Sequence, residues 1–307
     1  MRETNTFSGA VIQRAGPPIS CRSVARSAMA LAATLIGVCA TAEVALAASP
    51  EVTAAFSAHK VGATVQVDHH AWDQLLKSYV KPAADGVNRV DYKSFKANGG
   101  AALKAYVADL ERTKVSALDR PVQLAFWINL YNAKTVDIVL DHYPVASIRD
   151  ISLEESLLGF LKKSVGAGGP WKTPIVNVEG RRLSLDNIEH DILRPVFKDP
   201  RVHYAVNCAS YGCPNLQAAA FTGANADAML TEGAKAYVNH PRGISVKDGR
   251  VKASSIYNWF QTDFGGSDAG VLQHVRLYAT PELKAALAGV TAIDSYDYDW
   301  RLNDISR

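Results

Sequence analysis

The amino-acid sequence predicts an α+β protein built around one long, apolar helix. Helical patterns dominate the first half of the chain, and hairpin patterns alternate with helices in the second half. This order favours α+β over a doubly wound parallel sheet. The longest helical pattern, Asp119 to about His142, is apolar on nearly every side, as a buried helix is. We therefore expect a long central helix packed on a small, mostly antiparallel sheet.

The first 47 residues have the pattern of a secretory signal peptide. A polar stretch with four arginines precedes an apolar run, Ala28 to Ala42, and Ala45-Leu46-Ala47 is a typical cleavage sequence. The run is shorter than the roughly 20 residues that span a bilayer, which disfavours the alternative of an uncleaved anchor. We predict an exported protein, periplasmic or secreted, with no membrane span after cleavage.

The composition excludes several classes of protein. The chain has 307 residues, of which 48% are hydrophobic, and a formal net charge of +3. These values are ordinary for a globular protein and argue against a disordered chain or a nucleic-acid partner. Removal of residues 1–47 would leave a charge of +1 and two of the four cysteines, Cys208 and Cys213.

The elements before the long helix are short. Residues 48–67 lack a clear pattern and are expected to be a flexible segment before a single domain at 68–307. Apolar residues at helical spacing predict two helices, with a short strand between them. These elements are expected at Asp68–Val80 and Ala101–Lys114 for the helices, and at Asn88–Tyr92 for the strand.

The boundaries of the long helix are marked by its flanking residues. Asp119 is a suitable N-cap, and Pro121 fits the first turn. Pro144 stops the helix after His142. Two asparagines, Asn129 and Asn132, lie three residues apart in this apolar helix, where buried amides need hydrogen-bond partners. They either bond to neighbouring backbone or line a pocket.

The second half alternates hairpins and helices. Turn residues at Glu179-Gly180 and Lys247-Asp248-Gly249 predict two hairpins. The strands are expected at Thr173–Val178 with Arg181–Leu183, at His203–Val206, at Ile244–Val246 with Val251–Ala253, and near Ala292–Tyr298. The helices are expected at Leu185–Val196 after a Ser184 cap, at Ala226–Val238 after an Asn225 cap, and near Ile256–Phe260, Ala269–Tyr278 and Pro281–Leu287.

The loop Asn207 to Asn215 is the strongest candidate for a functional site. It follows the expected buried strand and concentrates four side chains that bear chemistry: Asn207, Cys208, Ser210 and Cys213. Loops presented by a rigid strand often carry function. The cysteines allow three interpretations: a disulfide, as suits an exported protein, nucleophilic catalysis by Cys208, or a metal site shared with histidines, although Cys-x4-Cys lies at the edge of zinc spacing.

Catalysis by Cys208 requires a base, and two histidines are available. If His203 begins an extended strand that ends at Cys208, about five residues separate the two by roughly 16 Å, too far for contact. His190, on the capped helix, is the better partner. Asp186 lies one helical turn before it and can orient the imidazole. Asn132 is a candidate oxyanion donor, and the remaining polar residues, Asn129, His203, Asn207, Ser210 and Cys213, are assigned to binding.

Four blocks of sequence resemble the signature of a known family, the domain of unknown function 547. The blocks are Ala125–Ala133, Leu183–His190, Asp199–His203 and Asn207–Pro214, and the resemblance extends from Asp68 to Asn303. It implies an exported bacterial protein whose site includes both cysteines and both histidines, but it implies no particular reaction. The expected architecture is also similar to papain-like and transglutaminase-like folds, a likeness of fold alone.

Two functions are compatible with the sequence, and it leaves open whether the protein is an enzyme. The first is a thiol-dependent hydrolase or acyltransferase on a peptide-like bond, with Cys208 as nucleophile, His190 as base, Asp186 as its orienting residue and Asn132 as oxyanion donor. The alternative is a non-catalytic cell-envelope binding module with a structural disulfide between Cys208 and Cys213. We expect a small-molecule or peptide-like ligand, no cofactor and no bound metal.

Overall fold

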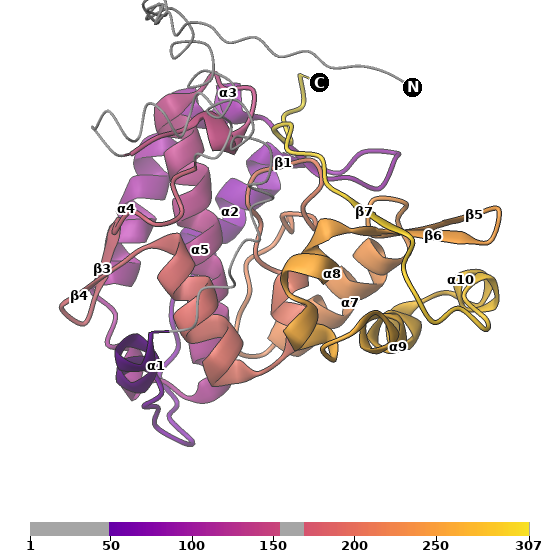
Figure 1. Cartoon of the computed structure of the whole chain (residues 1–307). Coiled ribbons are helices and arrows are strands. Elements are labelled where there is room, and N and C mark those ends of the chain that lie inside the picture. Colours follow the sequence, from indigo (N-terminus) through magenta and orange to yellow (C-terminus); the bar gives the residue numbers. More distant parts are fainter. Residues whose placement is uncertain (1–48, 154–168, 307) are drawn as a thin grey trace, which may run out of the picture. The chain divides into compact units, whose positions relative to one another are not determined.

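A computed structural model describes residues 49–153 and 169–306, which lie within one compact unit of the chain (Figure 1). The predicted signal segment, with Cys21 and Cys39, lies outside the described residues. Its boundaries, and that of the single domain, therefore stay predictions. Helices and small sheets make up the described part, which confirms the predicted α+β class.

The elements of the described residues follow the chain as drawn in Figure 1. The α-helices are α1 (Pro50–Phe56), α2 (His70–Tyr79), α3 (Tyr92–Asn98), α4 (Gly100–Glu111), α5 (Arg120–His142), α7 (Ala226–Val238), α8 (Ser255–Trp259), α9 (Asp268–Tyr278) and α10 (Pro281–Ala286). The other helical segments are η1 (Val115–Ala117), η2 (Ile148–Asp150), η3 (Asn187–Phe197), η4 (Pro200–Tyr204) and η5 (Gln261–Phe264). The strands are β1 (Val80–Lys81), β2 (Arg89–Val90), β3 (Val176–Val178), β4 (Arg181–Leu183), β5 (Ile244–Lys247), β6 (Arg250–Ser254) and β7 (Ser295–Asp297).

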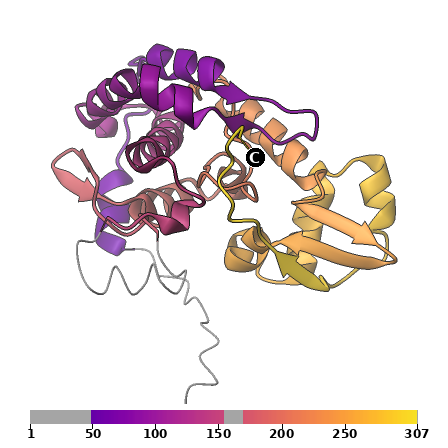
Figure 2. The same ribbon diagram turned by 90° about the horizontal axis from the view of Figure 1, so that it is seen from above.

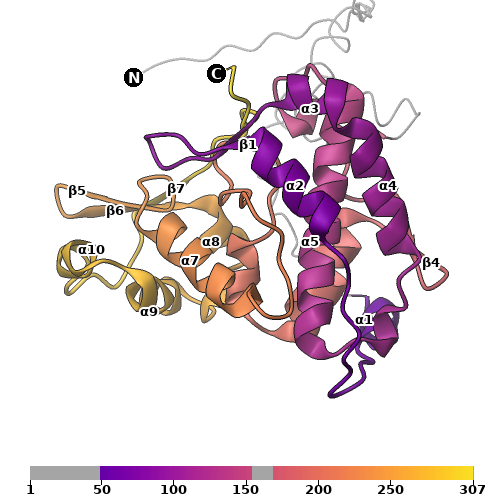
Figure 3. The same ribbon diagram turned by 180° about the vertical axis from the view of Figure 1, so that it is seen from behind.

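Helix α5 is the centre of the helical part. The Asp119 side chain accepts a hydrogen bond from the Arg120 amide at its start, and Pro121 lies in the first turn, as predicted. The helix is buried on nearly every side because α3, α4 and η3 pack around it. Figure 3 shows α4 beside it and α2 next to α4. The predicted central helix is present, but its main neighbours are helices rather than the expected sheet.

Helix α1 lies in the segment predicted to be flexible, residues 48–67. The Phe56 ring is buried against Trp127, with ring centroids 5.0 Å apart. The Thr53 hydroxyl donates to the Asp191 carbonyl at 2.7 Å, which ties α1 to η3. An apolar contact and a long-range hydrogen bond thus hold α1 against α5 and η3.

Both predicted hairpins are present. Each turn has two successive residues with positive φ, Glu179-Gly180 and Asp248-Gly249. This is the backbone of a two-residue hairpin turn whose twist matches that of the strands. Strand β7 then pairs with β6 in parallel and completes a three-stranded sheet. The register pairs Val176 with Leu183, Ile244 with Ala253, and Ala253 with Tyr296.

The predicted strand His203–Val206 is wrong, because the chain is helical at η4. The Asp199 side chain caps this helix by accepting a hydrogen bond from the Arg201 amide, and Pro200 occupies the first turn. An Asp-Pro pair is a signal for the start of a helix. The predicted strand did not take this signal into account.

The C-terminal segment connects the sheet to the helical part. After β7 it returns to β2, where the Val90 amide donates to the Asn303 carbonyl at 2.8 Å. On the way, the Tyr211 amide donates to the Arg301 carbonyl at 2.7 Å. Figure 2 shows this segment passing between the early helices and the sheet. Its path brings Tyr298 beside the cysteine loop.

Two hydrophobic clusters form the core. The first surrounds α5, and the second is built from α7, α9 and the sheet. Tyr204 belongs to the second cluster, whereas Ala205, Val206 and Ala209 belong to the first. The cysteine loop therefore starts where the two clusters meet.

Candidate functional site

The cysteine loop is anchored by the amide side chains of two asparagines. The Asn207 amide donates to the Asn132 Oδ1 atom of α5 at 2.8 Å, and the Asn132 Nδ2 group donates to the Ala205 carbonyl at 2.9 Å. The Asn207 side chain closes the loop by donating to the Pro214 carbonyl at 2.7 Å. Asn132 and Asn207 are both buried. The Asn132 side chain, predicted as an oxyanion donor, thus already forms hydrogen bonds that hold the cysteine loop.

Asn129 has a similar role one turn earlier on α5. Its Nδ2 group donates to the Phe221 carbonyl at 2.7 Å, and its Oδ1 atom accepts from the Phe221 amide at 3.1 Å. The side chain is fully buried. Both asparagines therefore bond to backbone far along the chain, which is one of the two interpretations that the sequence left open.

The thiols of Cys208 and Cys213 are adjacent. Their sulfur atoms lie 2.6 Å apart, and the Cys208 amide donates to the Cys213 sulfur at 3.0 Å. Both thiols are free, with Cys213 buried and Cys208 half-buried. A disulfide bond is about 2.05 Å long, so a small movement of the side chains, together with a two-electron oxidation of the thiols as in an oxidising compartment, would close one.

Tyr298 and Ser210 complete a hydrogen-bonded chain to the thiols. The Ser210 hydroxyl donates to the Tyr298 hydroxyl at 2.9 Å, and the Tyr298 hydroxyl donates to the Cys213 sulfur at 3.1 Å. The Tyr298 hydroxyl also lies 3.1 Å from the Cys208 sulfur. Burial raises the pKa of Tyr298 well above its ordinary value, so the hydroxyl stays protonated and remains a donor.

The pKa values of the two thiols are shifted in opposite directions. Burial alone would raise the pKa of Cys213, but hydrogen bonds from Cys208 and Tyr298 outweigh it and lower the pKa to about 7. The hydrogen bond to Cys213, together with burial, raises the pKa of Cys208. Because the two titrations are coupled, the lowered value belongs to the pair, which shares one proton near neutral pH.

Replacing Tyr298 with phenylalanine is expected to raise the apparent pKa of the thiol pair in the reduced protein by about one unit. A hydrogen bond to a charged group contributes about 1.5–3 kcal/mol, and one pKa unit corresponds to about 1.4 kcal/mol. The pH dependence of alkylation by iodoacetamide measures the change. Tyr296→Phe is the matched control, since the Tyr296 hydroxyl bonds to Asp268 and not to the thiols. An unchanged pKa in Tyr298→Phe would show that the hydroxyl does not stabilise the thiolate.

A second cluster surrounds His203, which is buried between two carboxylates. Its Nε2 atom lies 2.7 Å from an Asp263 oxygen and its Nδ1 atom 3.6 Å from a Glu189 oxygen. Arg194 forms a bidentate pair with Asp263 at 2.5 and 3.1 Å. The His203 ring stacks on Phe260, with centroids 4.2 Å apart.

The charges of this cluster support one another. Burial alone would lower the pKa of His203, but the hydrogen bonds and charges of Asp263 and Glu189 outweigh it and raise the pKa. Burial alone would raise the pKa of Glu189, yet His203 and the neighbouring cations lower it to about 2. The pKa of Asp263 is lowered for the same reason. The cluster is therefore an imidazolium held between two carboxylates.

His190 and Asp186 lie next to this cluster, one turn apart as expected. The His190 Nε2 atom is 3.9 Å from an Asp186 oxygen. The His190 Nδ1 atom is 3.1 Å from an Arg194 Nη1 atom, and since arginine only donates, Nδ1 must accept. The tautomer with its proton on Nε2, facing Asp186, is thereby favoured. Burial raises the pKa of Asp186.

The cysteines and the histidines form separate clusters. Among residues 49–153 and 169–306, no hydrogen bond or ion pair joins Cys208 to His190 or His203. Both clusters act on the buried Tyr131 of α5: burial raises its pKa most, and the charges of Glu189 and Cys208 both add to the effect. The predicted base, His190, and the predicted nucleophile, Cys208, are thus not joined by a hydrogen bond in the described ranges.

The sequence did not identify several residues of these clusters. Some of them come from segments that lie far along the chain from the residues they contact. Others lie on η3, a helix whose turns are wider than those of an α-helix. The alternation of acidic and aromatic residues around Tyr298 was the one available signal. The missed residues are Tyr131, Glu189, Arg194, Asp263 and Tyr298.

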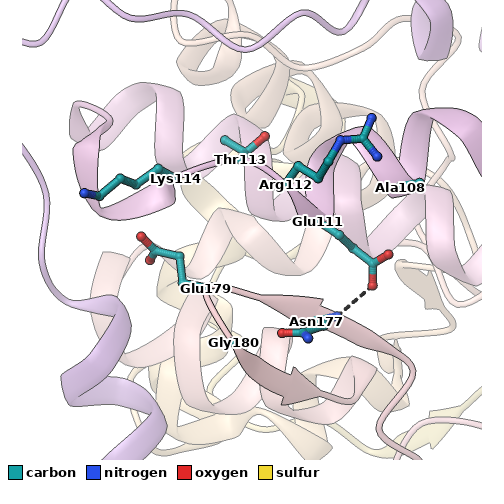
Figure 4. A pocket seen from close by; sticks show the side chains of 8 residues that line it. All are labelled: Ala108, Glu111, Arg112, Thr113, Lys114, Asn177, Glu179 and Gly180. Atoms are coloured by element: carbon teal, nitrogen blue, oxygen red, sulfur yellow. Dashed lines mark hydrogen bonds between the residues drawn. The ribbon is translucent and has the colours of Figure 1, made fainter.

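Two open grooves lie away from both clusters. One, of about 560 Å³, lies between the end of α4 and the β3–β4 hairpin (Figure 4). The Asn177 amide crosses it and donates to Glu111 at 2.7 Å. The other, of about 430 Å³, lies between α4 and the segment before α2. Their lining residues contribute no nucleophile paired with a base, so we place the candidate site at the two clusters.

In residues 49–153 and 169–306, no three His, Cys, Asp or Glu side chains come together in a way that could hold a metal ion. Within the same ranges, no helix combines the length and apolar character that crossing a membrane requires.

Comparison with family models finds one similarity and no activity. Residues 115–238 match the model of DUF547, described as a protein of unknown function. This confirms the predicted resemblance over the segment from η1 to the end of α7, which includes α5, both histidines and the cysteine loop. Searches of curated proteins and of solved structures found no match. The likeness to papain and transglutaminase folds stays a prediction.

Proposed function

We propose that this protein is a non-catalytic binding module of the cell envelope, in which Cys208 and Cys213 form a disulfide that fixes the loop at its ligand site. The observation that carries the proposal is the 2.6 Å separation of the two sulfur atoms. Each thiol has the other thiol as its nearest partner, as expected for a bridge rather than for a nucleophile with its base.

The ligand site proposed here lies between the two clusters, around Tyr131. Its ligand would be a small molecule or a peptide-like group, as the sequence suggested. The disulfide would hold the loop in the conformation that Asn132 and Asn207 already favour. The proposed location, periplasmic or secreted, rests on the pattern of residues 1–47 alone.

A thiol-dependent hydrolase or acyltransferase is the second candidate function. The lowered pKa of the thiol pair supports it, because a thiolate near neutral pH is the attacking species in such enzymes. Cys208 is the more exposed sulfur and would be the nucleophile. His190, with Asp186 behind it, would act as base only after a movement that brings it past Tyr131.

Reduction of the native, exported protein is expected to lower its melting temperature by about 4–8 °C. A bridge that closes so short a loop contributes about 2 kcal/mol, and each kcal/mol shifts the midpoint of such a domain by about 2–4 °C. Thiol titration and the intact mass, which is 2 Da lower for a disulfide, measure the bridge directly. Calorimetry with and without reductant measures its effect.

The double variant Cys208→Ser/Cys213→Ser is the control, since reductant should leave its melting temperature unchanged. Two titratable thiols in the native protein, with no effect of reductant, would contradict the binding-module proposal. If those free thiols also reacted with iodoacetamide along a pH profile centred near 7, the hydrolase would be favoured instead.

A further inference from the structure

Four aromatic side chains from three distant segments meet beside the thiol pair. Trp259, at the end of α8, lies 4.9 Å from Tyr298 and 5.6 Å from Trp300 between ring centroids. Tyr298 and Trp300 are 4.7 Å apart, and Trp171 lies 5.7 Å from Trp300. All four rings are half-buried. We call these four residues the aromatic cluster.

In the described part of the chain, the indole N–H groups of the three tryptophans of this cluster form no hydrogen bond. Among residues 49–153 and 169–306, the indole N–H groups of Trp171, Trp259 and Trp300 have no hydrogen-bond acceptor, whereas the Tyr298 hydroxyl is engaged with Ser210 and the thiols. Buried tryptophans usually place this group against a partner. These three residues are half-buried, and their N–H groups are not among the enclosed groups without a partner, so within the described ranges these donors are available to a ligand.

Two polar groups without a hydrogen bond in the described ranges are relevant here: the Asp186 carboxylate beside the aromatic cluster, and the Tyr131 hydroxyl, on which the Asp186 charge acts. The Tyr131 side chain is 2% exposed, yet its hydroxyl has no hydrogen-bond partner within the described ranges, and the charges of Asp186 and Cys208 both reach it. The Asp186 amide donates to the Trp171 carbonyl at 3.0 Å, which places Asp186 next to the cluster. The Asp186 carboxylate forms an ion pair with His190 at 3.9 Å, beyond hydrogen-bond distance, and the charges of Lys172, Glu189 and Asp191 also act on it.

The chemistry of these groups distinguishes between three kinds of ligand. A proline-rich peptide fits aromatic surfaces and offers carbonyl acceptors, but its prolines have no N–H to donate to a carboxylate. A quaternary ammonium group binds aromatic faces but can neither accept from the indoles nor donate to Asp186. A sugar ring has an apolar C–H face and a rim of hydroxyls that both donate and accept.

We infer that the aromatic cluster, with Asp186 and Tyr131, is a carbohydrate-binding site that holds sugar rings of an oligosaccharide by stacking. The aromatic rings contact the C–H faces of the sugars. The indole N–H groups donate to sugar oxygens, and the Asp186 carboxylate accepts from a sugar hydroxyl. The inference deepens the proposed function, because it names the ligand class of the binding module, but it does not require the disulfide.

Binding of chitohexaose and cellohexaose to the full, folded protein tests this inference. Titration calorimetry and tryptophan fluorescence should show saturable binding of at least one of them. Trp259→Ala and Trp300→Ala should each weaken it at least tenfold, as the loss of an aromatic contact at a binding centre does. Trp300→Phe should weaken it less, because it keeps a ring but loses the N–H. Leu277→Ala, at an exposed position of α9, should bind as the parent does.

The alternative outcomes separate this inference from the proposed function. Absence of binding to either sugar, or binding that both tryptophan variants retain, would overturn the carbohydrate site. Binding of decaproline or choline at these same tryptophans would also overturn it, while leaving a binding module intact. Sugar binding by a protein whose two thiols are free would support the inference and contradict the structural disulfide.

Discussion

Replacing His203 with glutamine is expected to lower the free energy of unfolding by about 3–5 kcal/mol, the usual cost of removing one partner from a buried ion pair. The His203 side chain is 1% exposed and lies 2.7 Å from Asp263. A neutral amide cannot balance both Asp263 and Glu189, so one buried carboxylate would lose its counter-charge. Urea unfolding followed by fluorescence measures the change.

The pH dependence of this loss follows from the directions of the pKa shifts. The pKa of His203 is raised in the folded state, so its contribution is complete below the unfolded value of about 6.5 and is lost as the pH rises through the folded value. The pKa of Glu189 is lowered to about 2, so its contribution is complete above its unfolded value and is lost on acidification. The difference between parent and variant should therefore be largest between about pH 4.5 and 6.5.

The matched control for His203→Gln is the same substitution at the exposed His70. Exposed positions without special contacts change stability by about 0.5 kcal/mol at most. If His203→Gln cost as little as His70→Gln at pH 6, the imidazole would not be charged between the carboxylates, and the description of the second cluster would fail.

Replacing Asn132 with alanine is expected to cost about 2–4 kcal/mol. The substitution leaves the Ala205 carbonyl and the Asn207 amide without partners in a buried place, and each such group costs about 1–3 kcal/mol. The missing side chain also leaves a small cavity beside α5. Chemical denaturation measures the loss, and the thermal midpoint should fall with it.

Asn258→Ala is the control for this substitution, because Asn258 lies exposed on α8 and should change stability little. Asn129→Ala should resemble Asn132→Ala, since Asn129 also bonds a buried amide and carbonyl, both of Phe221. A cost below about 0.5 kcal/mol for Asn132→Ala would mean that water or a rearranged loop satisfies the freed groups. In that case the anchoring of the cysteine loop by α5 would be refuted.

Local signals in the sequence were enough for most of the fold. Helix α5 has a capping aspartate, a proline in its first turn and apolar residues all round, and all three signals agree with the observed element. The hairpins were predictable because glycine follows a turn residue between short apolar strands. The helix at Pro200–Tyr204 was missed because five residues are too few positions to show a helical period.

The candidate site was predictable only where its residues are neighbours in sequence. Cys208, Ser210 and Cys213 share one loop, and Asp186 and His190 share one helix, so both pairings were visible. Tyr298 reaches the thiols from 85 residues or more along the chain. Asp263 likewise reaches His203 from a distant helical segment. Tertiary folding alone creates such contacts, and no periodicity in a single sequence encodes them.

The two asparagines of α5 also determine how the cysteine loop can move. The loop is irregular, yet its start at Asn207 and the later backbone at Phe221 are both bonded to side chains one turn apart on a buried helix. Irregular segments usually open on their own at low cost, in local fluctuations that leave the rest of the fold intact. Here such an opening would have to break buried bonds to α5, so Cys213 is exposed only when the core itself loosens. Reagents and partners meet Cys208 first, and the inner sulfur is protected by the stability of the helix and not by the loop that carries it.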